Sequence, residues 1–240
     1  MTLLVQNLAD CQRLFGDDHP EILAARNHLA RAYRVADRVD DALPLLEQNA
    51  AARERILGPD HIDTLTSRNN LADAYRRLGR LSEAVPMLEQ NLANRRRVLG
   101  DDHPDTLTSR NDLASALKAA GHLPAAIRLY EENLAERRRV LGQDHPDTLM
   151  AVHNLASAYH LTGRTEEAVL LWTQDLSDCQ RLLSADHPLT RAIHTSLRRV
   201  GQRRLPRRQR LERERIRHRS PATRFLTCPD YRGKIIRVVA

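Results

Sequence analysis

An aspartate followed by a histidine recurs every 42 residues in the sequence, and this pair is the pattern most able to do chemistry. A carboxylate beside an imidazole can bind a metal ion or transfer a proton. If each copy begins its own stacked pair of helices, however, successive copies lie about 20 Å apart, since each helix is about 10 Å wide. No two copies could then share a metal ion, so we interpret each as a turn that begins a helix. The pairs are Asp18-His19, Asp60-His61, Asp102-His103, Asp144-His145 and Asp186-His187.

Patterns typical of enzymes are missing from the sequence. It contains no GxSxG nucleophile elbow, no HExxH zinc motif and no GxxxxGK(S/T) phosphate loop. Seven of the nine glycines recur at fixed positions of the 42-residue period, which leaves almost none for a loop that binds phosphate. We therefore predict a protein that is not an enzyme and that carries no cofactor and no metal.

The cysteines argue against a scaffold held together by disulfides or by zinc. Cys11, Cys179 and Cys228 form no CxxC pair, which fits the reducing cytoplasm. Cys11 and Cys179 lie four periods apart at one position of the repeat, so they cannot pair within a rigid stack, and we expect both to be small buried residues. The first ten residues do not resemble a signal peptide, and no apolar run reaches the roughly 18 residues of a membrane span. We expect a cytoplasmic protein with no membrane partner.

The net charge of +7 comes from the C-terminal end of the chain. Residues 198–240 contain 15 basic and 3 acidic side chains, so the first 197 residues hold the other 23 basic and 28 acidic ones. Only two of the 38 basic residues are lysine, a bias that codon usage in a GC-rich genome explains. The body of the protein is therefore mildly acidic, and its richness in arginine is not by itself a sign of nucleic-acid binding.

The basic tail allows several interpretations, which the sequence leaves open. Between Arg198 and Arg219 there are 11 arginines in 22 residues. This segment could be disordered with a non-specific charge, bind nucleic acid or another acidic surface through phosphate contacts, extend a helix, or result from a frameshift. Because no aromatic residues are interleaved, we expect any nucleic-acid binding to be non-specific. A short β-prone run follows at 235–239, and the large apolar residues before it are too sparse for a core face: Leu205, Leu211 and Ile216.

Each period predicts two antiparallel helices, as the third period illustrates. A first helix begins at Pro104, after a cap that either Asp102 or His103 could provide, and is ended by a glycine at 121. A second helix begins near 123 or 124 and runs to the glycine at 142. The apolar face of the first helix has helical spacing and comprises Leu107, Leu113, Ala114 and Leu117.

Composition and charge add detail to this helical prediction. Only 3% of the residues are aromatic, so alanine and leucine must fill the core, which favours close-packed helices. We expect Pro44 and Pro86 near the first turn of their second helices, where proline is tolerated. The runs Arg95–Arg97 and Arg137–Arg139 lie on second helices, and we expect them on an outer, solvated face.

The repeated positions resemble those of a known family. The pattern Asn-Leu-Ala-x-Ala-Tyr-x-x-x-Gly-Arg-x-x-Glu-Ala over 70–84 is similar to the tetratricopeptide repeat. The 42-residue period and the LGxDHPxTL junction resemble the kinesin-light-chain subtype of that repeat, and the resemblance covers roughly residues 1–197. It implies an all-α fold, a right-handed superhelical solenoid of antiparallel helix pairs. It also implies a non-catalytic scaffold that binds a peptide or partner protein in a concave groove.

The period divides the chain into an incomplete leading repeat, four repeats and a degenerate fifth. Neither end resembles a capping repeat, so we expect a fragment of a longer array. Another alternative is a regulatory sensor part of a larger signalling ATPase of the NB-ARC/STAND type. The predicted boundaries are a second helix at 1–15, repeats at 16–57, 58–99, 100–141 and 142–183, a first helix at 184–199 and an irregular tail at 200–240.

The resemblance assigns a peptide-binding groove to one face of the first helices. Asparagine amides both donate and accept hydrogen bonds, so a row of them could hold an extended peptide backbone. The residues are Asn27, Arg31 and Arg34; Asn69, Asn70, Asp73 and Arg76; Asn111, Asp112, Ser115 and Lys118; and His153, Asn154 and Ser157, followed by His160.

Two features of this set bear on the partner. The cations Arg31, Arg34, Arg76 and Lys118 would favour a partner with acidic side chains or a terminal carboxylate. The carboxylate-clamp version of the family has lysine at the position of Asn27 and asparagine at that of Arg31, so binding of a chaperone tail is not expected. In the alternative interpretation, the asparagines bond between neighbouring helices and hold the stack together. The oligomeric state stays open.

Overall fold

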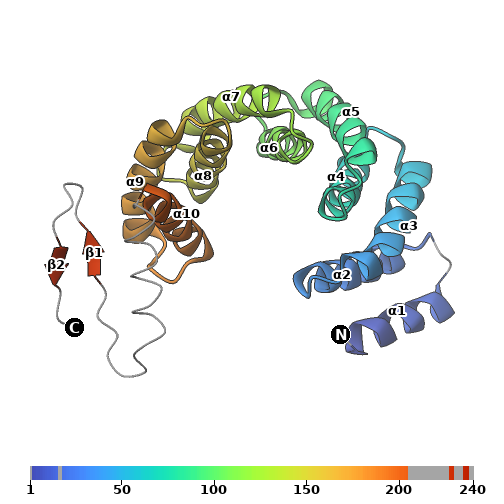
Figure 1. Ribbon diagram of the computed structural model, residues 1–240. Coiled ribbons are helices and arrows are strands. Elements are labelled where there is room, and N and C mark those ends of the chain that lie inside the picture. The colour runs from blue at the N-terminus through green and yellow to red at the C-terminus, as the bar shows by residue number, and fades with distance from the viewer. Residues whose placement is uncertain (1, 16–17, 205–226, 230–234, 238–240) are drawn as a thin grey trace. The chain divides into compact units, whose positions relative to one another are not determined.

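The computed structural model describes residues 2–15, 18–204, 227–229 and 235–237, and it divides into two units, Met1–His194 and Thr195–Ala240. The described part contains ten helices, and the predicted all-α solenoid of helix pairs is confirmed (Figure 1). The helices are α1 (Thr2–Leu14), α2 (Pro20–Val35), α3 (Val39–Leu57), α4 (Ile62–Arg77), α5 (Leu81–Leu99), α6 (Pro104–Ala119), α7 (Leu123–Leu141), α8 (Pro146–Leu161), α9 (Thr165–Leu182) and α10 (Pro188–Arg204).

The repeated histidine caps the first helix of each repeat. His103 has an extended backbone (φ −65°, ψ 136°), and its Nδ1 accepts a hydrogen bond from the backbone N–H of Asp105 at 3.1 Å. The same bond recurs at His19, His61, His145 and His187, at 3.1–3.3 Å. The imidazole thus satisfies one of the N–H groups that a helix start leaves without a partner. This settles which residue of the pair forms the cap.

The neighbouring aspartates have a different task. Asp18, Asp60, Asp102 and Asp144 each form an ion pair with the arginine 37 residues later, on the second helix of the same repeat. The interpretation of Asp-His as a structural turn is therefore confirmed, with the two side chains in separate roles. These exposed pairs are worth little individually, about 0–1 kcal/mol each.

Residues with a positive φ follow the ends of the helices, and they recur at fixed positions of the 42-residue period. Gly121 (φ 83°) follows α6 and Gly142 (φ 85°) follows α7, a conformation that costs glycine nothing. Two equivalent positions hold other residues with positive φ, Asp37 (φ 57°) and Ser184 (φ 111°). The equivalent Gly16 lies outside the described residues.

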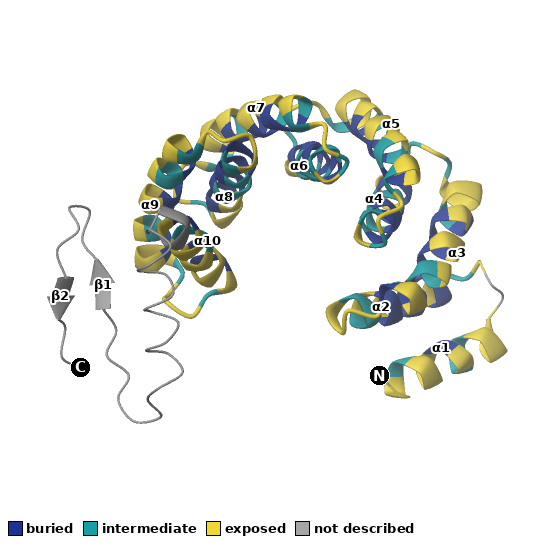
Figure 2. Ribbon diagram, viewed as in Figure 1, coloured by how far each residue is buried: buried dark blue, intermediate teal, exposed yellow. Residues whose placement is uncertain are grey.

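Consecutive helices form two rows within the unit Met1–His194. From α1 to α9, each helix packs against the next one in this series, and α6 also contacts α4 and α8. In Figure 1, α2, α4, α6 and α8 form the inner row, whereas α3, α5, α7 and α9 form the outer row. Buried residues concentrate between the rows, and the outer helices expose their far sides (Figure 2).

Alanine makes the close approach of the two rows possible. The first helices contribute Ala30, Ala72, Ala114 and Ala156, all fully buried. The second helices contribute Ala42, Ala84, Ala126 and Ala168, also fully buried. Around them pack leucines such as Leu88, Leu92 and Leu113. Small residues at the contact let the helix axes approach, so the low aromatic content of the chain follows from its packing.

The structure corrects three predictions about single residues. Arg95 and Arg137 are buried, 3% and 6% exposed, although the solvated face predicted for their runs holds for the other four arginines. They point toward the next first helix: the Arg95 Nη1 donates to the Asp105 carbonyl at 2.7 Å. Cys11 is only partly buried, whereas Cys179 is buried as expected. Pro44 and Pro86 lie inside α3 and α5, beyond the first turn, because these helices begin at Val39 and Leu81.

The second unit holds few described residues besides the end of α10. α10 reaches Arg204, five residues beyond the predicted helix end at 199. Strand β1 (Thr227–Pro229) pairs antiparallel with β2 (Ile235–Arg237), with Cys228 opposite Ile236, and β2 falls within the β-prone run. The interpretations of residues 205–226 lie outside the described residues. Across the part of the chain that is described, no helix has both the length and the apolarity to cross a membrane.

Candidate functional site

All the predicted groove residues lie on the inner-row helices α2, α4, α6 and α8, and we call them together the inner strip. All are partly buried except Arg31, which is exposed. Residues four and seven positions apart, such as Asn69, Asp73 and Arg76, share one side of their helix. The positions repeat from helix to helix, so the strip forms columns that run across the stack.

The asparagines of the strip connect neighbouring helices. The Asn69 Nδ2 on α4 donates to the Asp112 Oδ2 on α6 at 2.5 Å, and the Asn154 Nδ2 on α8 donates to the Asn111 Oδ1 on α6 at 2.9 Å. Asn111 also donates to Asp112 at 3.4 Å, which completes a chain of bonds across three helices. The alternative interpretation, in which these amides bond between helices, therefore holds for the three asparagines. The Asn69 Oδ1 also accepts from Asn91 and Ser109, both at 3.2 Å, so both of its lone pairs are used, whereas the Asn111 Oδ1 keeps one lone pair for a ligand.

Asp73 is the most strongly paired carboxylate of the strip. It accepts hydrogen bonds from Arg34 of the preceding inner helix at 2.5 Å, from Arg76 at 2.6 Å and from Arg77 at 3.0 Å. Arg34 also donates to Asn70 at 3.3 Å. Burial alone would raise the pKa of Asp73, but the Arg76 hydrogen bond and the charges of the three arginines lower it below its usual value. Asp73 therefore neutralises much of the positive charge around it.

Lys118 lies in the same column as Arg34 and Arg76 but has no carboxylate partner among the described residues. Serine occupies position 115, where the preceding helix has Asp73, and the Ser115 hydroxyl pairs with the Tyr130 hydroxyl at 2.8 Å. The Lys118 ammonium lies 5.5 Å from the centre of the Tyr130 ring. Burial, with a smaller contribution from Arg76, lowers the pKa of Lys118. A half-buried ammonium without a counter-ion favours an anion from a ligand.

Asp112 balances this region only in part. Burial raises the pKa of Asp112, and the nearby charge of Asp73 raises it further, against the hydrogen bonds from Asn69 and Asn111. The carboxylate is thus held by amides rather than by a cation. The strip consequently keeps an excess of positive charge at Arg31 on α2 and at Lys118 on α6, the inner helices that precede and follow α4.

The last inner helix has a different chemistry. His153 stands where α2, α4 and α6 have asparagine, and its buried Nδ1 has no hydrogen-bond partner. Burial, and to a lesser degree Lys118, lowers the pKa of His153 to about 4, so the imidazole is neutral. Its ring centre lies 6.3 Å from that of Trp172, and the His160 ring lies 5.8 Å from the same indole. Ser157 donates to the His153 carbonyl at 2.8 Å.

A second set of polar residues, absent from the sequence prediction, lies inside the stack on the outer helices. Asn49, Asn91 and Asn133 are buried, 42 residues apart. The first two donate to the carbonyls of Leu23 and Leu65 at 3.1 and 2.9 Å. In the amide orientation that satisfies its neighbours, Asn133 donates to the Leu107 carbonyl at 2.9 Å. The period itself was the signal, since a polar residue recurring amid apolar positions indicates a buried structural bond.

The side chains of the strip are of kinds that can bind a ligand. Among residues 2–15 and 18–201, no three His, Cys, Asp or Glu side chains are grouped so that they could hold a metal ion. The strip offers amides, hydroxyls and two cations that have no carboxylate partner within the described parts of the chain, spaced along adjacent inner helices. Groups of this kind recognise backbone amides and carboxylates through hydrogen bonds.

The chain matches known proteins along most of its length. The family model described as "Tetratricopeptide repeat" matches residues 21–95, 76–135 and 124–174. The nearly identical TPR-like repeats of a Podosopora anserina protein described as a kinesin light chain are 35% identical, with a TM-score of 0.65 over 83% of this chain and 95% of that one. BtubC (BKLC) from P. vanneervenii has the same TM-score at 17% identity, over 95% of this chain and 94% of that one, and shows the fold alone. No curated protein matches.

Proposed function

Because this chain belongs to the tetratricopeptide repeat family, in its kinesin-light-chain-like form, we propose that it binds an extended acidic peptide of a partner protein along the inner strip. Repeats of this family indicate a protein-interaction scaffold. The finer assignment, that the strip is the binding surface and that the peptide is acidic, is the proposal. In this proposal, the predicted strip residues form the hydrogen bonds and ion pairs to the bound peptide.

The observation that carries the proposal is the state of Lys118. Its ammonium is partly buried, lies over the Tyr130 ring and has no carboxylate partner in the described chain. An ion held in this way is costly unless a counter-ion arrives, so a peptide carboxylate would gain a charge-assisted hydrogen bond there. Arg31, exposed on α2, would contact a second acidic residue farther along an extended chain.

The asparagines would fix the peptide backbone without reading its side chains. Asn111 already accepts from Asn154 and donates to Asp112, so its remaining lone pair would accept from a peptide N–H. Because Asn69 also bonds to Asp112, truncating it would disturb the helix contact as well as the ligand. Arg31 and Lys118, for which no hydrogen bond to another inner helix is found among the described residues, are therefore the better test.

The test measures binding of labelled extended peptides by fluorescence anisotropy. An acidic peptide, a neutral peptide and a lysine-bearing peptide of one length are compared on the wild-type chain and on Arg31→Ala/Lys118→Ala. We expect the acidic peptide to bind best and the double variant to lose about tenfold in affinity, because two charge-assisted contacts are removed. Circular dichroism should show the same helicity in both proteins.

The matched control removes two arginines of the outer helices. Arg128→Ala/Arg138→Ala changes the net charge equally, but both positions are exposed on α7. This control should bind the acidic peptide like the wild type. Equal losses in the two double variants would mean that binding follows net charge, and equal affinity for all three peptides would disprove the acidic specificity.

A further inference from the structure

Three of the four repeats close the end of the first helix with the same group of three side chains. A tyrosine near the end of the first helix carries an arginine over its ring, and an acidic residue at the start of the second helix holds that arginine. The guanidinium carbons lie 4.9, 4.3 and 3.7 Å from the ring centres. The groups are Tyr33, Arg38 and Asp41; Tyr75, Arg80 and Glu83; and Tyr159, Arg164 and Glu167.

The tyrosine hydroxyl also reaches the second helix of the preceding repeat. The Tyr75 hydroxyl donates to the Glu47 Oε1 on α3 at 2.9 Å, and the Tyr159 hydroxyl donates to the Glu131 Oε1 on α7 at 2.6 Å. The ring thus lies between two repeats, with an apolar body against the helices and a polar tip at a carboxylate.

The third repeat lacks all three members of this group. It has Leu117, His122 and Ala125 at the positions of the tyrosine, the arginine and the acid, whereas Glu89 on α5 keeps the position of Glu47 and Glu131. The Leu117 side chain is shorter than a tyrosine, and the His122 imidazole is smaller than the guanidinium group that covers the tyrosine ring in the other repeats. The volume that these side chains fill elsewhere should therefore be empty here.

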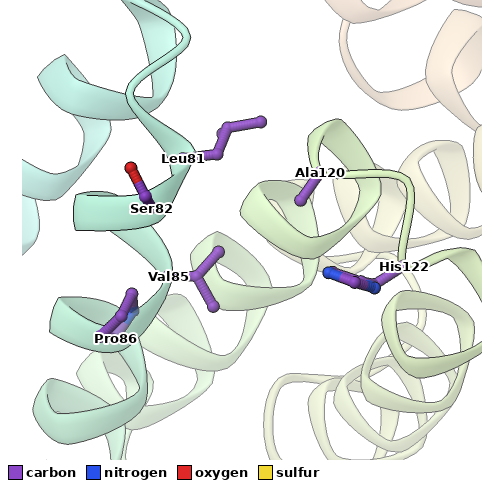
Figure 3. A pocket seen from close by; sticks show the side chains of 6 residues that line it. All are labelled: Leu81, Ser82, Val85, Pro86, Ala120 and His122. Carbon is purple, nitrogen blue, oxygen red and sulfur yellow. The ribbon is translucent and has the colours of Figure 1, made fainter.

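A pocket opens beside one of these three positions, and His122 lines it. Its volume is about 290 Å³, and it opens between the start of α5 and the turn from α6 to α7 (Figure 3). Ligand pockets usually measure about 300–1,000 Å³, so this one has room for a single side chain. Glu89 stands one helical turn beyond Val85 on α5. The lining residues are Leu81, Ser82, Val85, Pro86, Ala120 and His122, and Figure 3 shows His122 facing Val85 across the opening.

We propose that this pocket binds a tyrosine side chain of a partner protein. The same fold shows which group fills the equivalent volume in the repeats on either side, and it is a phenol whose hydroxyl donates to the glutamate at the position of Glu89. The ring packs against Val85 and Leu81, and the His122 imidazole lies where the arginine covers the ring in the other repeats. The pocket is separate from the inner strip and shares none of its residues.

The experiment titrates the full chain with 4-methylphenol and follows backbone amide signals by NMR. We expect shifts at Val85, Ala120 and His122, with a dissociation constant on the order of 1 mM for so small a ligand in an open pocket. The matched compound 4-methylanisole has the same ring but no hydroxyl to donate, and it should bind at least about tenfold more weakly. Glu89→Gln should reduce this preference, because a neutral amide oxygen accepts the phenol proton less strongly than a carboxylate.

Two reciprocal variants test the structural origin of the pocket. Leu117→Tyr/His122→Arg/Ala125→Glu restores the group of the other repeats, so the third repeat should fold as they do and lose phenol binding. Tyr75→Leu/Arg80→His/Glu83→Ala copies the third repeat into the second, and it should create a second site with shifts at the equivalent residues of α3. Shifts located elsewhere in the wild type, no binding at millimolar phenol, or unchanged binding in the filled variant would each overturn the proposal.

Discussion

The second repeat and the fourth repeat share one backbone design but differ in how they treat polar groups in their interiors. In the second repeat, Asn91 is fully buried, and its Nδ2 donates to the Leu65 carbonyl at 2.9 Å and to the Asn69 Oδ1 at 3.2 Å. In the fourth repeat, the same position holds Asp175, whose buried Oδ2 has no hydrogen-bond partner. Its other oxygen receives only a weak bond from the Cys179 thiol at 3.8 Å.

The difference extends to the residues around this position. Arg95, one turn after Asn91, bonds to the Asp105 carbonyl and to Thr66, whereas the fourth repeat has Cys179 there. Among the described residues, the buried Trp172 Nε1 and His153 Nδ1 also lack hydrogen-bond partners in the fourth repeat. In the second repeat, the Asn91 Oδ1 and the Arg95 Nε lack partners too, but each of these side chains makes other hydrogen bonds. The fold thus tolerates a buried carboxyl group in the fourth repeat, at a position where the other repeats have an amide donor, because the neighbouring repeats hold the stack. The fourth repeat should therefore be the less stable of the two, and its polar positions should respond to pH.

The largest effect should come from truncating the buried amide of the second repeat. Asn91→Ala removes two hydrogen bonds and leaves the Leu65 carbonyl and a cavity behind, which should destabilise the protein by about 2–4 kcal/mol. Asp175→Ala removes a buried carboxyl group that the interior satisfies poorly, so it should cost about 0–1 kcal/mol. The two truncations are equivalent in position, which makes the difference between them the measurement of interest.

Hydrogen exchange on the full chain provides the measurement, because stacked repeats can open separately and a single global transition would hide the difference. Protection of α5 should fall strongly in Asn91→Ala, whereas protection of α9 should change little in Asp175→Ala. Equal losses at the two sites would mean that Asp175 stabilises its repeat as well as Asn91 does, and that the fourth repeat is not the less stable of the two.

A smaller, opposite effect should follow from restoring the amide to the fourth repeat. Burial raises the pKa of Asp175 to about 7. Between about pH 4 and pH 7, the folded state therefore keeps a proton on Asp175 that the unfolded state, with a carboxyl pKa of about 3.9, has already released. This contribution to stability is present below about pH 4 and is lost as the pH rises through 7. Asp175→Asn should therefore gain about 1–3 kcal/mol at pH 8, and less at pH 5.

The reciprocal control is Asn133→Asp in the third repeat. This substitution replaces the amide that donates to the Leu107 carbonyl by a carboxyl group. The variant should therefore be less stable than the wild type at pH 8 and recover part of the lost stability at pH 5. Urea denaturation at the two pH values measures both variants. If Asp175→Asn gives the same gain at pH 5 and pH 8, the buried carboxyl group does not titrate in this range.

The repeat period predicted much of the fold because helix boundaries are a local property. Phase alone placed a second helix from 123 or 124 to 142, and the structure has it at Leu123–Leu141. It could not decide between Asp102 and His103 as the cap, since that depends on which side chain the extended backbone turns toward the helix. The choice is visible only in three dimensions, where the His103 Nδ1 faces the Asp105 N–H.

The wrong prediction for Arg95 and Arg137 has a physical cause. A run of arginines suggests a solvated face, but adjacent helical residues point in directions about 100° apart, so one of three can face inward. The sequence did contain the signal, because Arg95 and Arg137 share their position in the period with Cys11 and Cys179, which were expected to be buried. The strip could be placed on the right helices from the resemblance, but the Arg34–Asp73 ion pair and the Asn69–Asp112 hydrogen bond could not, because each joins residues of different repeats.

The smallest effect concerns His153, and its sign is opposite to that of Asp175. Burial lowers the pKa of His153 to about 4, whereas an unfolded histidine titrates near 6.5. As the pH falls below about 6.5, the unfolded state binds a proton that the folded state does not bind until about pH 4, so stability is lost between these two pH values.

His153→Asn copies the asparagine found at this position in α2, α4 and α6, and it should remove the loss. We expect a gain of about 1 kcal/mol at pH 5 and almost none at pH 7.5. Because Asp175 becomes more stabilising over the same range, the comparison belongs in the Asp175→Asn background, where this carboxyl group no longer contributes to the pH dependence. A pH-independent gain there would show that the substitution acts by repacking against Trp172, and no gain at pH 5 would show that His153 keeps an ordinary pKa.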